Sequence, residues 1–303
     1  MAKKKKSFTG VLTALVTPML DGKISFSDLE NLIERQVQAR IQGLVVAGTT
    51  GESPTLDQKE HLEIIRFTVE KTAGRIPIIA GTGANCTKEA IQLVKEADQL
   101  NIDGHLQVVP YYNKPTQEGL FQHFSNIAEN TIKPIILYSI PGRCQIEISV
   151  ETIVRLRKKF PHVCCLKEAG GQCDKVSEVI KQLGDEILVL SGDDSLTLPF
   201  ISVGAKGVVS VLANFLPDQM VTLVQKALDN DFQSARQIHQ NLFSLSKQLL
   251  QLEPNPVGIK QILFDQEIIQ SPEVRLPLSS AREESQTLLQ KSLQNYFSTN
   301  FKN

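Results

Sequence analysis

The stretch VCCLKEAGG, residues Val163 to Gly171, decides how this 303-residue chain is interpreted. Four apolar residues with the density of a buried strand end at Lys167, and Gly170 and Gly171 then open a turn before the next helical pattern. A free lysine titrates near pH ~10.4, so about one molecule in a thousand is neutral at physiological pH, and only the neutral amine attacks a carbonyl. Desolvation at the carboxyl end of a buried strand would lower that pKa. The alternative is a lysine that caps the strand and extends to water.

Length, composition and charge limit the class of protein. The chain is 41% hydrophobic with a formal net charge of −1, which favours a large buried core and offers no basic surface for nucleic acid. No apolar run reaches membrane-spanning length, and the charge run Lys3–Lys6 is expected to be a solvated tail. The five cysteines lack paired spacing and the five histidines lack a metal-ligand motif, so we expect neither disulfides nor a metal site. We expect a cytoplasmic protein without a nucleic-acid or membrane partner.

Eight short apolar runs alternate with amphipathic helical patterns. The predicted strands are 11–16, 44–47, 76–80, 105–109, 134–138, 163–166, 187–190 and 207–211. Eight units between Val11 and Leu228 average about 27 residues each, the usual size of a strand, a helix and two loops. We therefore predict an α/β fold, a (β/α)8 TIM barrel. An open doubly wound sheet is the alternative, but its best nucleotide-binding candidate, Gly81–Cys86, lacks the third glycine.

The chain continues beyond the eighth unit with further helical patterns. These patterns cover 232–252 and 281–296, around a proline-bounded segment at 253–264, and they carry few catalytic residue types. We predict a barrel at 1–228, including its short basic N-terminal tail, and a C-terminal helical appendage at 229–303. The appendage is expected to pack on the barrel or on a neighbouring subunit.

Residues just beyond the strands are the candidates for an active site, because barrels build their sites at the carboxyl ends of the strands. The run Gly48–Ser53 (GTTGES) combines glycines with hydroxyls and suits a small carboxylate, with a plain turn as the alternative. Tyr111, Tyr112 and Tyr138 lie at two further strand ends, and a phenol that hydrogen-bonds a threonine can relay protons. Arg143 offers a fork for a second carboxylate, with a surface arginine as the alternative.

The loops after the seventh and eighth strands exclude one class of substrate. Phosphate-binding barrels hold their anion on these loops. Here the seventh strand is followed by Asp193 and Asp194, which would repel a phosphate, and 212–215 contains no glycine. Sugar phosphates are therefore poor candidates.

Taken together, these motifs resemble the dihydrodipicolinate synthase family of the class I pyruvate-dependent aldolases. The resemblance covers Phe8 to Pro277. Its markers are Thr17–Met19, GTTGES at 48–53, IAGTGAN at 79–85, PYYNKP at 110–115, Tyr138–Arg143, Lys167–Glu168 and LSGDD at 190–194. The resemblance implies a lyase of lysine and diaminopimelate biosynthesis that condenses pyruvate with L-aspartate 4-semialdehyde.

The resemblance also implies a role for each matching residue. Lys167 would form a Schiff base with pyruvate. Tyr138, Thr49 and Tyr112 would relay protons, with Tyr112 reaching in from a neighbouring subunit. The substrate-binding residues would be Thr50 for the pyruvate carboxylate, Arg143 for the carboxylate of the semialdehyde, and Val209 and Gly192 lining the pyruvate pocket. The lysine itself is the covalent catalyst in this chemistry, so the resemblance implies neither a cofactor nor a metal.

Regulation and assembly follow from the same resemblance. In this family L-lysine inhibits from a cleft at a tight dimer interface, and the matching positions here are Ser53, His61, Asn85, Glu89 and Tyr111. Gln58 replaces a histidine of several lysine-sensitive members. We expect L-lysine binding and a homotetramer built as a dimer of dimers.

Two other functions stay open at this point. One is another pyruvate-dependent aldolase or lyase, such as N-acetylneuraminate lyase, although such enzymes usually lack an arginine at the position of Arg143. The other is a catalytically silent regulatory barrel, which the loss of the lysine or of a relay residue would favour. Three departures from the family pattern are Ser139 and Cys144, which flank Arg143, and Gly258, which is expected to loosen a loop at the barrel mouth.

Overall fold

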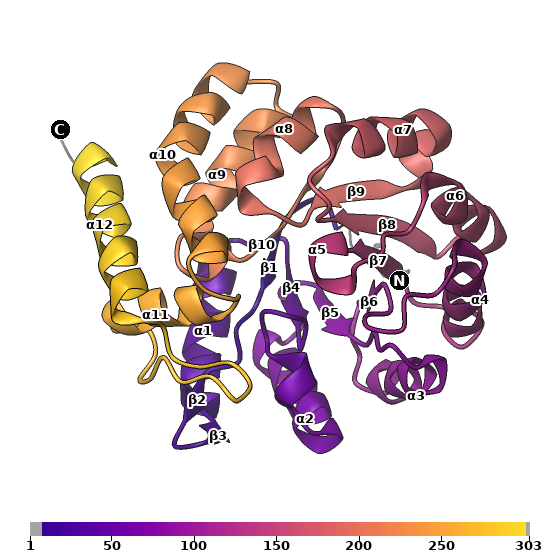
Figure 1. Cartoon of the computed structure of the whole chain (residues 1–303), viewed down its shortest axis with the longest axis horizontal. Coiled ribbons are helices and arrows are strands. Elements are labelled where there is room, and N and C mark those ends of the chain that lie inside the picture. Colours follow the sequence, from indigo (N-terminus) through magenta and orange to yellow (C-terminus); the bar gives the residue numbers. More distant parts are fainter. Residues whose placement is uncertain (1–7, 301–303) are drawn as a thin grey trace.

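Eight parallel strands close into a barrel in the computed structural model, which describes residues 8–300 and the side chains of residues 8–298 (Figure 1). The strands are β1 (Gly10–Ala14), β4 (Gly43–Val46), β5 (Ile78–Gly81), β6 (Gly104–Val108), β7 (Ile135–Ser139), β8 (Val163–Glu168), β9 (Leu188–Ser191) and β10 (Gly207–Ser210). Their order around the barrel is β1-β10-β9-β8-β7-β6-β5-β4. The predicted TIM barrel is confirmed, and each predicted strand is present with small shifts at its ends. The predicted tail Lys3–Lys6 lies outside the described residues.

Helices follow the strands and surround the barrel (Figure 1). They are α1 (Phe26–Gln38), α2 (Gln58–Thr72), α3 (Thr87–Asp98), α4 (Gln117–Ala128), α6 (Val150–Lys159), α7 (Cys173–Leu183), α8 (Thr197–Ser202) and α9 (Pro217–Leu228). Several begin at a side chain that accepts a hydrogen bond from the first turn, and Asp57 and Glu60 form a capping box at the start of α2.

Shorter elements were not predicted, because two to four residues carry too little periodicity. They are the hairpin β2 (Met19–Leu20) and β3 (Lys23–Ile24), the helix α5 (Pro141–Cys144), and the 3₁₀ turns η1 (Ser53–Thr55), η2 (Gly184–Glu186), η3 (Asp194–Leu196) and η4 (Leu212–Asn214). Helix α5 and turn η1 begin just beyond β7 and β4, so they belong to the mouth of the barrel.

Apolar side chains form an inner layer and an outer layer. The inner cluster fills the barrel and includes Leu12, Val45, Ile79 and Val209. Larger clusters lie between the strands and the surrounding helices. Successive residues of a strand point to opposite faces, so strands buried on both faces need apolar residues at nearly every position.

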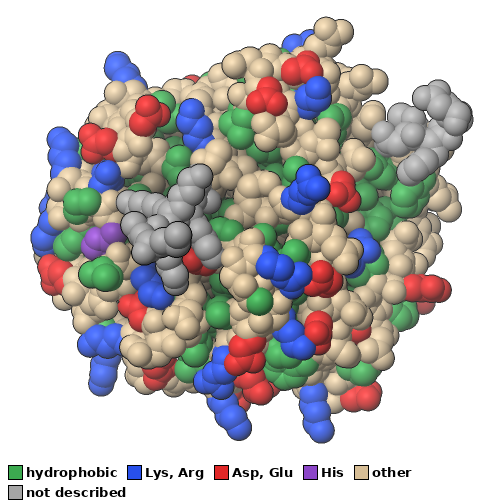
Figure 2. All heavy atoms as spheres, turned by 180° about the vertical axis from the view of Figure 1, so that it is seen from behind, with side chains coloured by type: hydrophobic (Ala, Val, Ile, Leu, Met, Phe, Trp, Pro, Cys, Tyr) green, Lys and Arg blue, Asp and Glu red, His purple; other side chains and the backbone are tan. Residues whose placement is uncertain are grey.

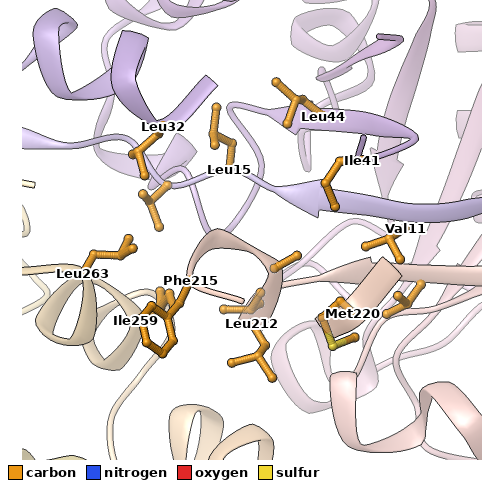
Figure 3. Close-up of a cluster of buried hydrophobic side chains, with 14 of the residues drawn as sticks. Val11, Leu15, Leu32, Ile41, Leu44, Leu212, Phe215, Met220, Ile259 and Leu263 are labelled. Carbon is orange, nitrogen blue, oxygen red and sulfur yellow. The ribbon is translucent and has the colours of Figure 1, made fainter. Parts of the chain in front are cut away.

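The C-terminal region is helical, as predicted. Its helices are α10 (Phe232–Gln251), α11 (Val257–Asp265) and α12 (Glu283–Asn300), and Figure 1 shows them together on one side of the barrel. Ile259 and Leu263 of α11 belong to the same apolar cluster as Leu32 and Phe215 of the barrel part (Figure 3). The division of the chain at residue 229 stays a prediction about domain organisation.

The expectation that Gly258 loosens a loop is wrong, because this residue lies in the buried first turn of α11. A Cβ atom added at Gly258 would lie 3.2 Å from the carbonyl oxygen of Leu249 in α10. The glycine therefore permits a close approach between α10 and α11.

Charged side chains of both signs are distributed over the surface. Figure 2 shows Lys and Arg side chains interspersed with Asp and Glu side chains on one face, consistent with the net charge of −1. Within residues 8–300, no helix combines the length and apolar character needed to span a bilayer. No group of three or more His, Cys, Asp or Glu side chains in that same range is arranged to hold a metal ion.

Candidate active site at the carboxyl ends of the strands

Lys167 lies inside the barrel and is only 5% exposed. The prediction that it follows the strand needs a correction, because β8 continues through Lys167 to Glu168. Strand alternation places Lys167 on the same face as Cys165, a member of the inner cluster. The register pairs Lys167 with Tyr138 of β7, and its Nζ atom lies 4.0 Å from the centroid of the Tyr138 ring.

Burial changes the charge state of this lysine. It lowers the pKa of Lys167 to about 7; the Asp194 carboxylate opposes this shift, and the Arg143 guanidinium adds to it. Roughly half of the Lys167 amine is therefore neutral at pH 7, against about one in a thousand for a free lysine. Desolvation in the barrel interior thus makes the amine a nucleophile, and no general base is needed to remove its proton.

Tyr138, whose ring lies next to the amine, is paired with Thr49. The Tyr138 side chain is buried, and burial raises its pKa well above the ordinary value, so the phenol stays protonated at neutral pH. Its side chain shares a hydrogen bond with Thr49, which lies in the turn after β4. Two of the three predicted relay residues are therefore in contact beside Lys167.

Tyr112, the third predicted relay residue, is not part of this group within the single chain. Its side chain is 91% exposed, and its backbone has a positive φ of 71°. The loop that carries it follows β6 and presents the phenol to the outside of the chain. The relay in one chain therefore ends at Thr49.

Two predicted carboxylate-binding groups are linked through a residue that the sequence analysis missed. The side-chain amide of Asn255 donates to Thr50 Oγ1 at 2.9 Å, and the Asn255 carbonyl oxygen accepts from Nη2 of Arg143 at 3.4 Å. Thr50 is buried, whereas Arg143 lies exposed on α5. Asn255 precedes α11 and is separated from Thr50 by 205 positions, so no local pattern could have revealed it.

Gly192, directly after β9, lies beside the lysine, and Val209 of β10 lies in the inner layer of the barrel. A Cβ atom at Gly192 would lie 3.2 Å from Cε of Lys167 and 2.7 Å from Cβ of Ala169, so a side chain has no room beside the lysine. Val209 is buried in the inner cluster that also contains Tyr138. Small or apolar neighbours on this side contribute to the desolvation of the amine.

Asp194 is a further residue that the sequence analysis did not place at the lysine. Its carboxylate is buried and accepts from the backbone amides of Val211 at 3.0 Å and Leu212 at 2.9 Å. Burial raises the pKa of Asp194 to about 6 despite these hydrogen bonds. The aspartate therefore fixes the start of the loop after β10 and carries a charge that acts on Lys167.

A cavity of about 450 Å³ opens beside the barrel mouth. Thr49 and Arg143 line it, as do four of the five residues predicted for L-lysine binding, Ser53, His61, Glu89 and Tyr111. Asn85, the fifth, is not among the lining residues but donates from its side chain to the Tyr111 carbonyl oxygen at 3.3 Å. Burial, followed by the charge of Glu89, raises the pKa of Tyr111. The cavity thus presents one carboxylate and one protonated phenol.

Ser139 and Cys144, the two residues near Arg143 that depart from the family pattern, have structural roles of their own. Ser139 Oγ accepts from Nζ of Lys175 at 3.1 Å, and Lys175 also pairs with Glu168 at 3.0 Å. Cys144 Sγ donates to the Val109 carbonyl oxygen at 3.1 Å, and burial raises the pKa of its thiol to about 11. Both side chains therefore have partners other than the arginine.

A closed parallel barrel with a desolvated lysine at the carboxyl ends of its strands has the fold and the nucleophile of a class I aldolase. Comparison with known proteins identifies the family. Residues 7–296 match the model of the "Dihydrodipicolinate synthetase family", so the chain belongs to this family. A relative from Persephonella marina named 4-hydroxy-tetrahydrodipicolinate synthase is 47% identical over 289 residues, covering 95% of this chain and 98% of the relative.

Solved structures agree with this assignment. The 4-hydroxy-tetrahydrodipicolinate synthase of Methylacidiphilum fumariolicum SolV matches with a TM-score of 0.94 and 46% identity over 96% of this chain and 97% of that one. A dihydrodipicolinate synthase from Cyanidioschyzon merolae, solved with lysine bound, matches with a TM-score of 0.92 and 35% identity over 95% of this chain and 98% of that one. Fold and sequence therefore point to the same family.

Proposed function

We propose that this chain is a 4-hydroxy-tetrahydrodipicolinate synthase, a lyase that condenses pyruvate with L-aspartate 4-semialdehyde in lysine and diaminopimelate biosynthesis. The single observation that carries the proposal is the buried Lys167 amine, 4.0 Å from the Tyr138 ring and with its pKa lowered to about 7. Relatives of this name at 42–47% identity over nearly the whole chain support the choice of reaction.

The mechanism starts with the neutral amine of Lys167. It attacks the ketone carbon of pyruvate, and loss of water gives a protonated Schiff base that acts as an electron sink. Tyr138, hydrogen-bonded to Thr49, is positioned to donate to and accept from the reacting groups while protons move. Removal of a methyl proton gives an enamine, whose carbon adds to the aldehyde of the second substrate. Attack by the amine of that substrate closes the ring and releases the lysine.

Separate groups are proposed to hold the two carboxylates. Thr50 would hold the pyruvate carboxylate, with Gly192 and Val209 shaping the space around the methyl and keto groups. Arg143 lies exposed at the mouth, where a second substrate arrives, and a guanidinium fork matches a carboxylate. Asn255 contacts both Thr50 and Arg143 and so fixes their relative position.

A coupled assay tests the proposed reaction. The wild-type protein should turn over pyruvate with L-aspartate 4-semialdehyde and leave N-acetylneuraminate unchanged. Arg143→Ala should lower kcat/KM for the semialdehyde by about 100-fold, because a charge-assisted bidentate contact is lost, while pyruvate binding is retained. Turnover of N-acetylneuraminate alone would favour an N-acetylneuraminate lyase. A protein that turned over neither N-acetylneuraminate nor pyruvate with the semialdehyde would favour the catalytically silent barrel.

We further propose that L-lysine binds in the cavity next to the mouth and inhibits the enzyme. The Glu89 carboxylate offers a charge for an ammonium group, and the cavity is shared with Thr49 and Arg143, which gives a direct route to the active site. Glu89→Gln should weaken inhibition by about tenfold, whereas Glu63→Gln, an exposed control on α2, should not. A titration with L-lysine that changed neither activity nor melting temperature would refute binding.

We propose a homotetramer, a dimer of dimers, located in the cytoplasm with the other enzymes of amino-acid biosynthesis. The exposed Tyr112 supports the assembly, because the relay needs a phenol that the single chain does not bring to Thr49. Light scattering coupled to size-exclusion chromatography measures the assembly directly. A monomer with full activity would contradict it.

A further inference from the structure

Glu52 and Lys260 form an ion pair in which both side chains are completely buried. The Glu52 carboxylate also accepts from the Arg275 backbone amide at 2.9 Å, and Lys260 Nζ also donates to the Glu273 carbonyl oxygen at 2.7 Å. The pair joins the turn after β4 to helix α11 across 208 positions of sequence. The proposed chemistry uses neither side chain.

Glu52 holds the turn that carries Thr49 and Thr50. Its backbone has a φ of 57°, a left-handed conformation that is uncommon for a residue other than glycine. In this conformation its amide donates to the Thr49 carbonyl oxygen at 3.1 Å. A strained backbone of this kind persists when the surroundings fix it, and the carboxylate anchored to Lys260 provides such a restraint.

The segment that carries Lys260 contacts the same turn a second time. Asn255, five positions before Lys260, donates from its side chain to Thr50 Oγ1 at 2.9 Å. Helix α11 is itself fixed by packing, because Ile259 and Leu263 lie in the apolar cluster with barrel residues (Figure 3). The turn is therefore held at Thr50 and at Glu52 by one rigid C-terminal element.

Stability alone does not account for this arrangement. A buried ion pair is often no more stabilising than a well-packed apolar pair of similar size. An anchored carboxylate does, however, define the position of a backbone turn more closely than an apolar contact would, and small displacements of binding groups cost large factors in rate.

We propose that Glu52 and Lys260 are positioning residues, through which helix α11 holds the Thr49–Thr50 turn in the geometry that receives the pyruvate carboxylate. The proposal rests on the proposed function. It gives the C-terminal region a role in the active site in addition to packing.

The test combines steady-state kinetics with hydrogen exchange on the full-length protein. In Lys260→Met, the amides of residues 48–53 should exchange about tenfold faster, and KM for pyruvate should rise about tenfold while KM for the semialdehyde stays within about twofold. The double variant Glu52→Gln/Lys260→Met should regain melting temperature relative to the single variants, because no unpaired charge is buried, but should keep the raised KM for pyruvate. Arg282→Met, which removes an exposed guanidinium that pairs with Glu253 in the same region, should leave both the exchange of residues 48–53 and the KM for pyruvate as in wild type.

Two results would overturn the positioning role. One is wild-type exchange of residues 48–53 in Lys260→Met, and the other is a double variant with wild-type KM for pyruvate, which would show that the pair only stabilises the fold. A different result would refute the proposed function itself: a wild-type protein that forms no adduct with pyruvate. That result would also remove the pyruvate part of this proposal.

Discussion

Lys167 is chemically unlike a lysine in water because its amine ends inside an apolar barrel. Its Nζ lies against the Tyr138 ring, Gly192 leaves no side chain beside Cε, and Asp194 supplies an opposing charge. Desolvation dominates the lowered pKa, so the barrel interior creates the nucleophile. This conclusion gives two predictions at the scale of single residues.

The rate of Schiff-base formation should depend on pH with a midpoint near 7. The neutral amine reacts, so below a pKa of about 7 the rate should fall by about tenfold for each pH unit. Initial rates of borohydride-trapped adduct between pH 5 and 9 measure this directly. A midpoint near pH 10 would show that the amine is exposed to water.

Replacing the lysine with an apolar residue should stabilise the protein at neutral and acid pH. The folded-state pKa of Lys167, about 7, is lower than that of an unfolded lysine, about 10.4, so folding is penalised fully below pH 7 and the penalty fades between pH 7 and 10. Lys167→Met should therefore raise the free energy of unfolding by roughly 2–4 kcal/mol at pH 6, with a smaller gain at pH 9.5. Urea denaturation at both pH values checks the sign; a gain that grows with pH would contradict it.

At the scale of elements, the strands could be predicted and their polar connections could not. Eight apolar runs were enough to place every barrel strand, because strands buried on both faces are apolar at nearly every position. Strand β8 extends beyond its predicted end because Lys167 and Glu168 occupy strand positions that an apolar pattern does not include. Contacts such as Asn255 with Thr50, or Lys260 with Glu52, join segments about 200 positions apart, and nothing in either segment indicates its partner.

Glu168 and Lys175 provide a prediction about how β8 is held. The Glu168 side chain is 0% exposed and pairs with Lys175 Nζ at 3.0 Å from the start of α7. Lys175→Met leaves the carboxylate buried without its partner, so we expect a loss of about 3 kcal/mol in the free energy of unfolding. Chemical denaturation measures the loss, and the double variant Glu168→Gln/Lys175→Met should recover most of it. A single variant as stable as wild type would show that the pair is not needed.

At the scale of the whole molecule, we propose that an assembly completes the site. Thr49 and Tyr138 could be predicted from motifs and meet in the structure, whereas Tyr112 is exposed and is proposed to meet them from a second chain. A sequence pattern identifies the residue type and its strand end, whereas quaternary contacts depend on surface complementarity that a pattern does not encode.

Complementation between inactive variants tests this shared site. Tyr112→Phe and Lys167→Ala should each be nearly inactive, yet a refolded mixture should recover about one quarter of the wild-type rate, because each mixed dimer contains one intact site. Mixing either variant with itself is the control. A mixture that stays inactive would show that each chain uses its own Tyr112.

The central claim is that one desolvated amine, that of Lys167, condenses with pyruvate. Wild-type protein is incubated with pyruvate and borohydride, and its mass is measured by mass spectrometry. The protein is then digested, and the modified residue is identified from the peptides. We predict a single reduced pyruvate adduct on Lys167, with none on Lys175 or Lys260, the other buried lysines among the residues whose side chains are described. No adduct, or an adduct on a different lysine, would contradict the account.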